Sequence, residues 1–328
     1  MGDVMRFFLI LAGSFAGIAV LAVAGVLAFD APVSPKPMQS VETALDHADF
    51  SDMPAPRSFA ARDGTRLTYR AYPGDPANTV ILIHGSSGNS ASMHLLARAL
   101  HARGANVYAL SLRGHDHLGR SGDIDYVGQL DDDLADFVKT LPPEPKGGHR
   151  TLLGFSSGGG FALRIAGGPY GHLFNRFILL APALPHDAPT IRPPQAGIAG
   201  GGWVSVAIPR MVILTTLSRL GIHAFEGLPV LAFAVPPRMR NVQTAFYSFR
   251  MAQNFGATQD YLGDLKHAPG PVSLFDGADD EIFIASRFAP LLKPVRPDLT
   301  VTILPGLDHM DMIVAPAALK AIGDKVAF

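Results

Sequence analysis

The sequence of 328 residues contains no cysteine, a single tryptophan and few charged side chains. The absence of cysteine excludes disulfides, thiolate nucleophiles, zinc–thiolate sites and cysteine-bound iron–sulfur clusters. Charged residues make up only 17% of the chain, and 27 basic against 28 acidic side chains leave a net charge of −1. A chain this neutral, without a long basic run, lacks the electrostatic pattern of a nucleic-acid-binding protein. We expect no nucleic-acid partner, no cofactor and no metal.

Hydrophobic residues are concentrated at the amino terminus, where residues 7–29 carry no charge. At about 1.5 Å per residue, a helix over this run would be about 34 Å long, enough to cross a bilayer core. Only Arg6 is basic before the run, so we expect the short amino terminus to stay in the cytoplasm. Residues 1–30 are therefore predicted to be a single-pass anchor, with the membrane as a partner and the remainder exported to the periplasm or cell exterior.

Two alternatives for this segment remain. A signal peptide cleaved near Ala22-Val23-Ala24 would release a secreted protein, although the run is long for such a peptide. The second alternative for residues 1–30 is a buried helix of a soluble domain. Residues 31–56, rich in proline, alanine and acidic side chains, are predicted to form a linker.

From residue 57 onward, short apolar runs alternate with helical patterns. A hairpin is expected around Asp63-Gly64. Continuous apolar runs without alternation are typical of strands covered on both faces, and they lie at Thr79–Ile83, Asn106–Leu112, Arg150–Phe155, Arg176–Leu180, Pro271–Phe275 and Thr300–Leu304. Helices are predicted over 91–103, 129–140, 157–167 and 311–328. This alternation indicates an α/β fold with a mostly parallel sheet and helices on both faces.

The alternation stops over residues 184–268, which is too long for an ordinary connection. Residues 197–235 hold only three charges, and prolines and glycine interrupt every candidate membrane helix there. We predict an inserted helical cap between two parts of the core, 57–183 and 269–328, with the substrate-binding residues somewhere within it. A larger core is the alternative.

The motif Gly154-Phe155-Ser156-Ser157-Gly158 lies between a predicted strand and a predicted helix. In this context G-x-S-x-G forms a sharp turn that exposes a nucleophilic serine above the sheet. The backbone N–H of Ser157, at the helix start, can then stabilise a developing oxyanion. A second donor is expected from the Ser86 N–H, in the loop His84-Gly85-Ser86-Ser87-Gly88 that ends an earlier strand.

A serine nucleophile needs a base, and the base needs an orienting acid. His309 follows the last predicted strand and is therefore expected at the same sheet edge as Ser156. Asp276, Asp279 and Asp280 follow the penultimate strand, and spacing alone does not choose between Asp279 and Asp280. His115 and His117 also follow a strand, and a polar loop is favoured there over a metal site.

The order Ser156, Asp280, His309 resembles the α/β-hydrolase fold over residues 57–328, and most of all its lysophospholipase and monoacylglycerol-lipase-like branch. That branch has an Arg-Gly-His loop, matched by Arg113-Gly114-His115, and a Gly-x-x-Asp motif that falls on residues 277–280 and selects Asp280. The resemblance implies an eight-stranded sheet and a variable cap. This sequence departs from that branch at two positions. Asp116 stands where the branch usually has glycine, and Phe155 stands where it often has histidine before the nucleophile. Asp187 would be the acid in a known family variant.

The implied reaction is hydrolysis of a small-molecule or lipid ester through an acyl-enzyme, with Ser156 as nucleophile, His309 as base and Asp280 as orienter. A peptidase or carbon–carbon bond hydrolase with the same triad is one alternative, and a tethered binding protein on this scaffold is another. Dehalogenases and epoxide hydrolases are disfavoured because they place aspartate where Ser156 stands. The sequence does not indicate an oligomeric state.

Overall fold

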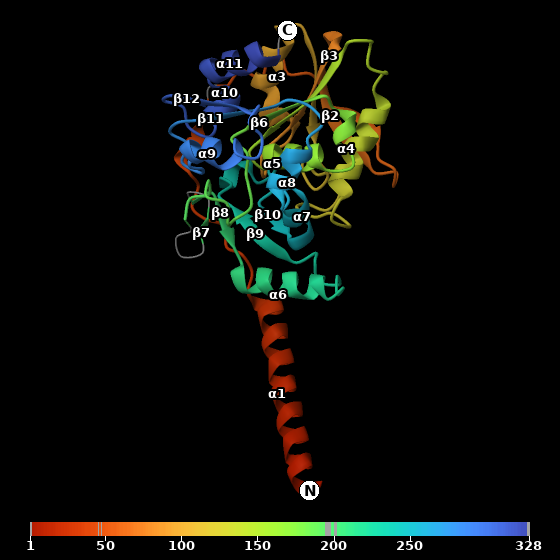
Figure 1. Cartoon of the computed structure of the whole chain (residues 1–328), viewed down its shortest axis with the longest axis vertical. Coiled ribbons are helices and arrows are strands. Elements are labelled where there is room, and N and C mark those ends of the chain that lie inside the picture. Colours follow the sequence, from red (N-terminus) through yellow and green to blue (C-terminus); the bar gives the residue numbers. More distant parts are fainter. Residues whose placement is uncertain (1, 45, 47, 194–197, 200–201, 327–328) are drawn as a thin grey trace.

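The computed structural model describes residues 2–44, 46, 48–193, 198–199 and 202–326, and statements about the predicted segments 1–30, 31–56, 184–268 and 311–328 concern these residues only. A twisted eight-stranded sheet lies at the centre of the body, with helices on both faces (Figure 1). Its strands are β1 (Arg57–Ala60), β2 (Arg66–Tyr72), β3 (Asp75–Ile83), β4 (Ala105–Ser111), β5 (His149–Phe155), β6 (Arg176–Leu180), β11 (Val272–Gly277) and β12 (Thr300–Leu304).

The strand order is β1-β2-β4-β3-β5-β6-β11-β12. β1 and β2 form the predicted hairpin, β2 is also antiparallel to β4, and every later pair is parallel. Val80 to Ile83 of β3 are completely buried, as expected for a central strand covered on both faces. The parallel direction brings the carboxyl ends of β3, β5, β11 and β12 to one edge of the sheet.

The predicted helices are present. They are η1 with α3 (Ser90–Met93, His94–His101), α4 (Gln129–Thr140), α5 (Ser157–Gly167), and α10 with α11 (Asp311–Val314, Pro316–Val326). α8 (Tyr261–His267) packs on α5, and α9 (Phe288–Leu292) precedes β12. Leu130, Leu134 and Phe137 of α4 are buried at helical spacing, while its acidic first turn and Lys139 in its last turn suit the helix dipole.

The insertion between β6 and β11 differs from the predicted helical cap, because it also contains a sheet. β7 (Ile198–Ala199), β8 (Val204–Val206), β9 (Pro229–Phe233) and β10 (Phe246–Ser248) are antiparallel neighbours in the order β10-β9-β8-β7. α6 (Ile208–Arg219) and α7 (Phe249–Asn254) accompany them. These strands are only two to five residues long, so no local periodicity distinguishes them from helix segments.

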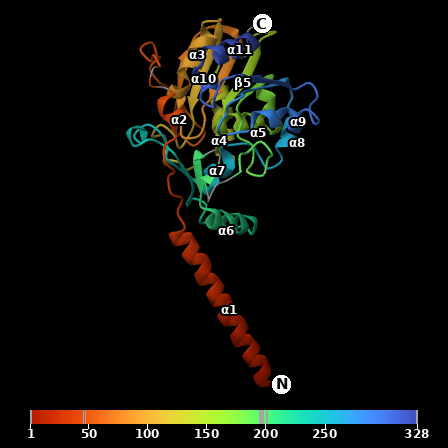
Figure 2. The same cartoon turned by 90° about the vertical axis from the view of Figure 1, so that its left-hand side faces the viewer.

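α1 (Gly2–Phe29) projects from the body as one long helix (Figures 1 and 2). Its segment Met5–Phe29 is long and apolar enough to cross a membrane, and its most apolar stretch has no buried residue among those whose side chains are described. The predicted linker contains α2 (Gln39–Thr43). This segment packs on the body, because Met38 and Val41 contact the core and the Ser40 hydroxyl donates to the Glu281 carboxylate.

Candidate active site

Ser156 sits in a strained turn between the end of β5 and the start of α5. Its φ is 55° and its ψ is −119°, a conformation that costs energy for any residue with a Cβ. Glycines make the turn possible, since a Cβ on Gly154 would lie 1.9 Å from the Gly158 carbonyl oxygen and one on Gly158 would lie 2.4 Å from that of His84. The structure thus contains the strand–turn–helix context expected from the sequence motif.

The loop after β3 lies directly against Ser156. A Cβ added to Gly85 would be 3.1 Å from the Ser156 Cβ. Among the hydrogen bonds of the part of the chain that the structure describes, none uses the backbone N–H of Ser86 or of Ser157. Unpaired N–H groups beside a serine hydroxyl are suited to bind a developing oxyanion.

His309 and Asp280 meet at the same edge of the sheet. The His309 Nδ1–H donates to the Asp280 Oδ2 at 2.6 Å, and both side chains are buried. Since Nδ1 carries the proton in this bond, Nε2 is left as a proton acceptor. The imidazole lies beside two rings, with centroid distances of 4.8 Å to Phe155 and 5.3 Å to Phe283.

The backbone around Asp280 holds its carboxylate in place. The Asp280 Oδ1 accepts the N–H groups of Ile282 at 2.7 Å and of Phe283 at 2.6 Å. Burial raises the pKa of Asp280, but the nearby His309, the Phe283 N–H and the Asp276 side chain outweigh it, so the pKa lies below its ordinary value. Asp280 is therefore ionised at neutral pH beside His309.

The other candidate acids lie elsewhere. Asp279 and Asp187 are exposed, and neither contacts His309 in the described part of the chain. Glu281, next to Asp280, accepts the backbone N–H of His309 at 3.2 Å. Because Ser40 also donates to Glu281, the segment before the core is linked to the loop that carries His309.

Asp276, at the end of β11, is a completely buried carboxyl beside Asp280. Its Oδ1 accepts the Gly277 N–H at 2.8 Å, and within the described residues no N–H or O–H group reaches its Oδ2. Burial and then the negative charge of Asp280 raise the pKa of Asp276 to about 9. A proton on Oδ2 can then be donated to Asp280, which explains how two carboxyls share this site.

Asp276→Asn is expected to increase the free energy of unfolding at pH 7.5 by at least about 1 kcal/mol. The unfolded chain releases this proton near pH 3.8 and the folded chain near pH 9. The folded state therefore binds the extra proton in between, and stability falls as the pH rises through that window. Urea unfolding at several pH values should show a flatter pH dependence in the variant. Asp279→Asn, at an exposed position, is the control. If the free energy of unfolding of Asp276→Asn depends on pH as steeply as that of the wild-type protein, Asp276 is not the group that takes up this proton.

A buried network joins the loop after β3 to the insertion. The Tyr247 hydroxyl of β10 accepts the Ser87 N–H at 2.8 Å and donates to the His115 Nε2 at 2.6 Å. His115 in turn donates from Nδ1 to the Arg113 carbonyl at 3.1 Å. Burial holds the pKa of His115 well below its usual range, which keeps it a neutral acceptor. The sequence pointed to a polar loop at His115, but nothing in it indicated Tyr247.

Two further contacts hold the same loop. The Trp203 Nε1–H donates to the Ser86 Oγ at 3.1 Å. His84 donates from Nδ1 to the Gly85 carbonyl at 2.8 Å and accepts the Leu112 N–H on Nε2, and burial lowers its pKa to about 4. A neutral His84 therefore supports its own loop. Among the described residues, no three His, Asp or Glu side chains are grouped to hold a metal ion.

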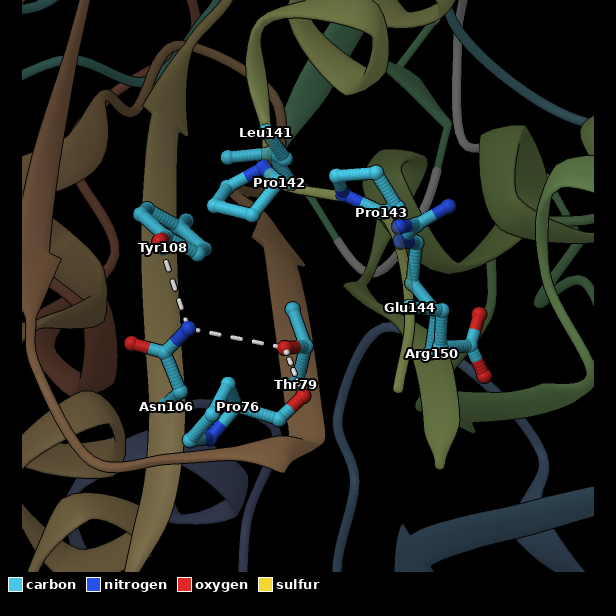
Figure 3. Close-up of a pocket in the computed structure, with 9 residues that line it drawn as sticks. All are labelled: Pro76, Thr79, Asn106, Tyr108, Leu141, Pro142, Pro143, Glu144 and Arg150. Atoms are coloured by element: carbon cyan, nitrogen blue, oxygen red, sulfur yellow. Dashed lines mark hydrogen bonds between the residues drawn. The ribbon is translucent and has the colours of Figure 1, made fainter. Parts of the chain in front are cut away.

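A small cavity of about 30 Å³ lies at the opposite end of the strands, where β3, β4 and β5 begin (Figure 3). Its lining includes Thr79, Asn106, Tyr108 and Arg150, and the Asn106 amide donates to Tyr108 and Thr79. A cavity of this size holds about one water molecule. It is remote from Ser156 and too small for an acyl ester.

Comparison with known proteins supports the fold. A monoacylglycerol lipase of Mycolicibacterium smegmatis is 35% identical over 138 residues, which are 40% of this chain and 48% of that protein. The chain thus spans about half the length of this relative. Two solved structures are similar in fold. The monoacylglycerol lipase of Paleococcus ferrophilus has a TM-score of 0.59 and 18% identity, covering 80% of this chain and 98% of the other.

The second structure is a soluble variant of monoglyceride lipase from Saccharomyces cerevisiae. It has a TM-score of 0.60 and 17% identity over 90% of this chain and 97% of the other. Residues 74–313 match the family model described as serine aminopeptidase, S33. This match covers most of the chain, including the strained serine turn and the His309–Asp280 pair. The chain therefore has the α/β-hydrolase fold and belongs to the serine aminopeptidase S33 family.

Proposed function

We propose that this protein is a serine hydrolase that cleaves carboxylic esters of apolar acyl groups, with Ser156, His309 and Asp280 as its catalytic triad. The observation that carries the proposal is the 2.6 Å bond between His309 Nδ1 and Asp280 Oδ2, at the sheet edge where the strained Ser156 turn lies. Acyl transfer by a triad requires a positioned serine, an imidazole whose Nε2 can accept a proton, and an ionised acid that orients the imidazole.

The residues act in two steps. His309 Nε2 takes the proton of Ser156 as its Oγ attacks the ester carbonyl, and Asp280 stabilises the charged imidazole. The backbone N–H groups of Ser86 and Ser157 bind the oxyanion of the tetrahedral intermediate. His309 then donates the proton to the leaving alcohol. A water molecule activated by the same imidazole releases the acyl group and restores the serine.

The substrate class is supported by sequence similarity to a monoacylglycerol lipase and by the apolar insertion over the site. Phe233 and Trp203 lie 5.8 Å apart between ring centroids, and Tyr247 packs on Phe233 at 4.6 Å. Mostly apolar surroundings suit an acyl chain. The matched family is described as serine aminopeptidase S33, so a peptidase that uses the same triad is the second candidate.

We place α1 in a membrane as a single-pass anchor, with the catalytic body on the exported side. Its length exceeds a hydrocarbon core of about 30 Å, and it projects away from the body (Figure 2). A signal sequence has the same composition and is the alternative. Mass spectrometry of the amino terminus of protein isolated from membranes distinguishes an anchor that is retained from one that is cleaved.

A fluorophosphonate probe tests the enzymatic proposal. Such probes react with an activated serine, so we expect one label per chain at Ser156 and none in Ser156→Ala. A panel of p-nitrophenyl esters, a monoacylglycerol and an aminoacyl anilide then separates an esterase from a peptidase. Absence of labelling in the folded wild-type protein would support a binding protein on this scaffold instead.

Tyr247→Phe is expected to lower kcat for a short ester by about 10- to 100-fold with little change in KM. The hydroxyl holds the Ser87 N–H and thereby the direction of the adjacent Ser86 N–H, and a small displacement of an oxyanion donor is costly in the transition state. Tyr247 is thus a positioning residue. Steady-state kinetics on a soluble ester measures the effect.

The matched control is Tyr72→Phe. Tyr72 is also buried and its hydroxyl bonds to a histidine, His94 Nδ1, at 2.9 Å. Both variants leave a buried polar group unpaired and should lose about 1–3 kcal/mol of stability. Only Tyr247→Phe should lose kcat. Equal kcat in the two variants would mean that Tyr247 acts on stability alone.

A further inference from the structure

The helix α6 lies crosswise at the carboxyl end of α1, between α1 and the rest of the insertion (Figures 1 and 2). The two helices are in contact. Leu27 of α1 packs against the buried cluster that Leu214 of α6 forms with Val230 and Phe249, and the Asp30 carboxylate accepts the Arg210 N–H at 2.9 Å. The place where α1 leaves the body is therefore also the place where α6 is held.

The exposed side of α6 carries large apolar residues beside Thr216. Ile208 and Val212, four residues apart and therefore on one side of the helix, are 51% and 59% exposed, and Leu220, directly after the helix, is 70% exposed. Leu214 and Arg210 are buried on the opposite side. Ile222 and Phe225, just after the helix, are exposed as well. Half of the exposed large hydrophobic residues described outside α1 lie between Ile208 and Phe225.

Within the segment 208–228 the exposed charge is basic. Arg219 is exposed, whereas the one acidic residue of this segment, Glu226, is buried and bonded to the exposed His223. A soluble surface would normally carry mixed charges here. Exposed apolar side chains with a basic residue, Arg219, beside them suit a segment that lies in the interface of a lipid bilayer.

We propose that the exposed face of α6, together with Ile222 and Phe225, lies in the surface of the bilayer that α1 spans. The inference rests on the proposed membrane anchor. α1 selects a bilayer as the occupant of this face, because an apolar helix that crosses a membrane brings its own end, and α6 with it, to the lipid headgroups. A helix in that position buries its apolar side about 5–10 Å into the headgroup and acyl boundary.

The absence of cysteine allows a direct test on the full-length protein. Single-cysteine variants Val212→Cys and Leu220→Cys carry an environment-sensitive fluorophore after reconstitution into vesicles of phosphatidylcholine and phosphatidylglycerol. Ile18→Cys, within α1, reports on the anchor. Lys320→Cys on α11, at the far end of the body (Figure 1), is the control that should remain in water. Nitroxide lipids labelled at shallow and deep positions measure the depth of each probe.

We expect shallow nitroxides to quench the Val212 and Leu220 probes at least about threefold more than the Lys320 probe, and deep nitroxides to quench the Ile18 probe most. If the Ile18 probe is quenched but the α6 probes behave like Lys320, the proposed face is wrong while the anchor stands. If no probe is quenched, the anchor and the face both fail. Hydrolysis of a soluble ester by each labelled protein shows separately whether the body is folded and whether the proposed esterase activity is present.

Discussion

Replacing Ser156 with alanine is expected to lower kcat for a short p-nitrophenyl ester by about 10⁵- to 10⁶-fold, leaving only the slow hydrolysis that a bound substrate undergoes without a nucleophile. In the proposed mechanism this hydroxyl forms the covalent bond to the acyl group, and no other hydroxyl occupies the strained turn at this position. Alanine keeps the Cβ and hence the same backbone conformation, at φ 55°. Circular dichroism and thermal unfolding should therefore match the wild-type protein.

Ser157→Ala is the matched control for this experiment. Ser157 contributes its backbone N–H, which alanine retains, so we expect kcat within about fivefold of wild type. Both variants remove a serine Oγ, and the two substituted positions are adjacent in the chain. Wild-type activity in Ser156→Ala, or a loss of activity in Ser157→Ala alone, would contradict the assignment of the nucleophile.

Asp280→Asn should lower kcat by about 10³- to 10⁴-fold. The asparagine oxygen can still accept the N–H groups of Ile282 and Phe283, so the loop should keep its shape. Its amide, however, cannot stabilise a charged imidazole, and it favours the tautomer in which His309 Nε2 carries the proton. In that tautomer Nε2 has no lone pair with which to accept the proton of Ser156. Kinetics of ester hydrolysis with a check of thermal stability measures the effect.

The neighbouring acid supplies the comparison. Asp279 is exposed and one residue away, and Asp279→Asn is expected to change kcat by less than about threefold. If the large effect appeared in Asp279→Asn and not in Asp280→Asn, the carboxylate seen beside His309 would not be the working acid. A loss confined to Asp187→Asn would point to the variant arrangement with the acid after β6.

Local sequence patterns predicted the elements that carry the site. The apolar runs of β3 and β5, the amphipathic spacing of α4 and the small residues of α5 each specify their structure within a few neighbouring residues. The sequence predicts a helical insertion, and the structure shows that it contains a four-stranded sheet as well as helices. The strands of this sheet are only two to five residues long, so a local pattern carries little information about them.

The sequence by itself predicted the strained turn at Ser156 and the position of His309 after the last strand. Glycine spacing and the place of a residue directly after an apolar run can both be read from neighbouring residues. Spacing left Asp279 and Asp280 open, the family resemblance selected Asp280, and the tertiary structure shows the Asp280 carboxylate on His309 Nδ1. Tyr247, 160 residues from Ser87, and Trp203, 117 residues from Ser86, were likewise found only in three dimensions. The physical reason is that these hydrogen bonds form between segments brought together by packing of the insertion on the sheet, and no local spacing encodes that packing.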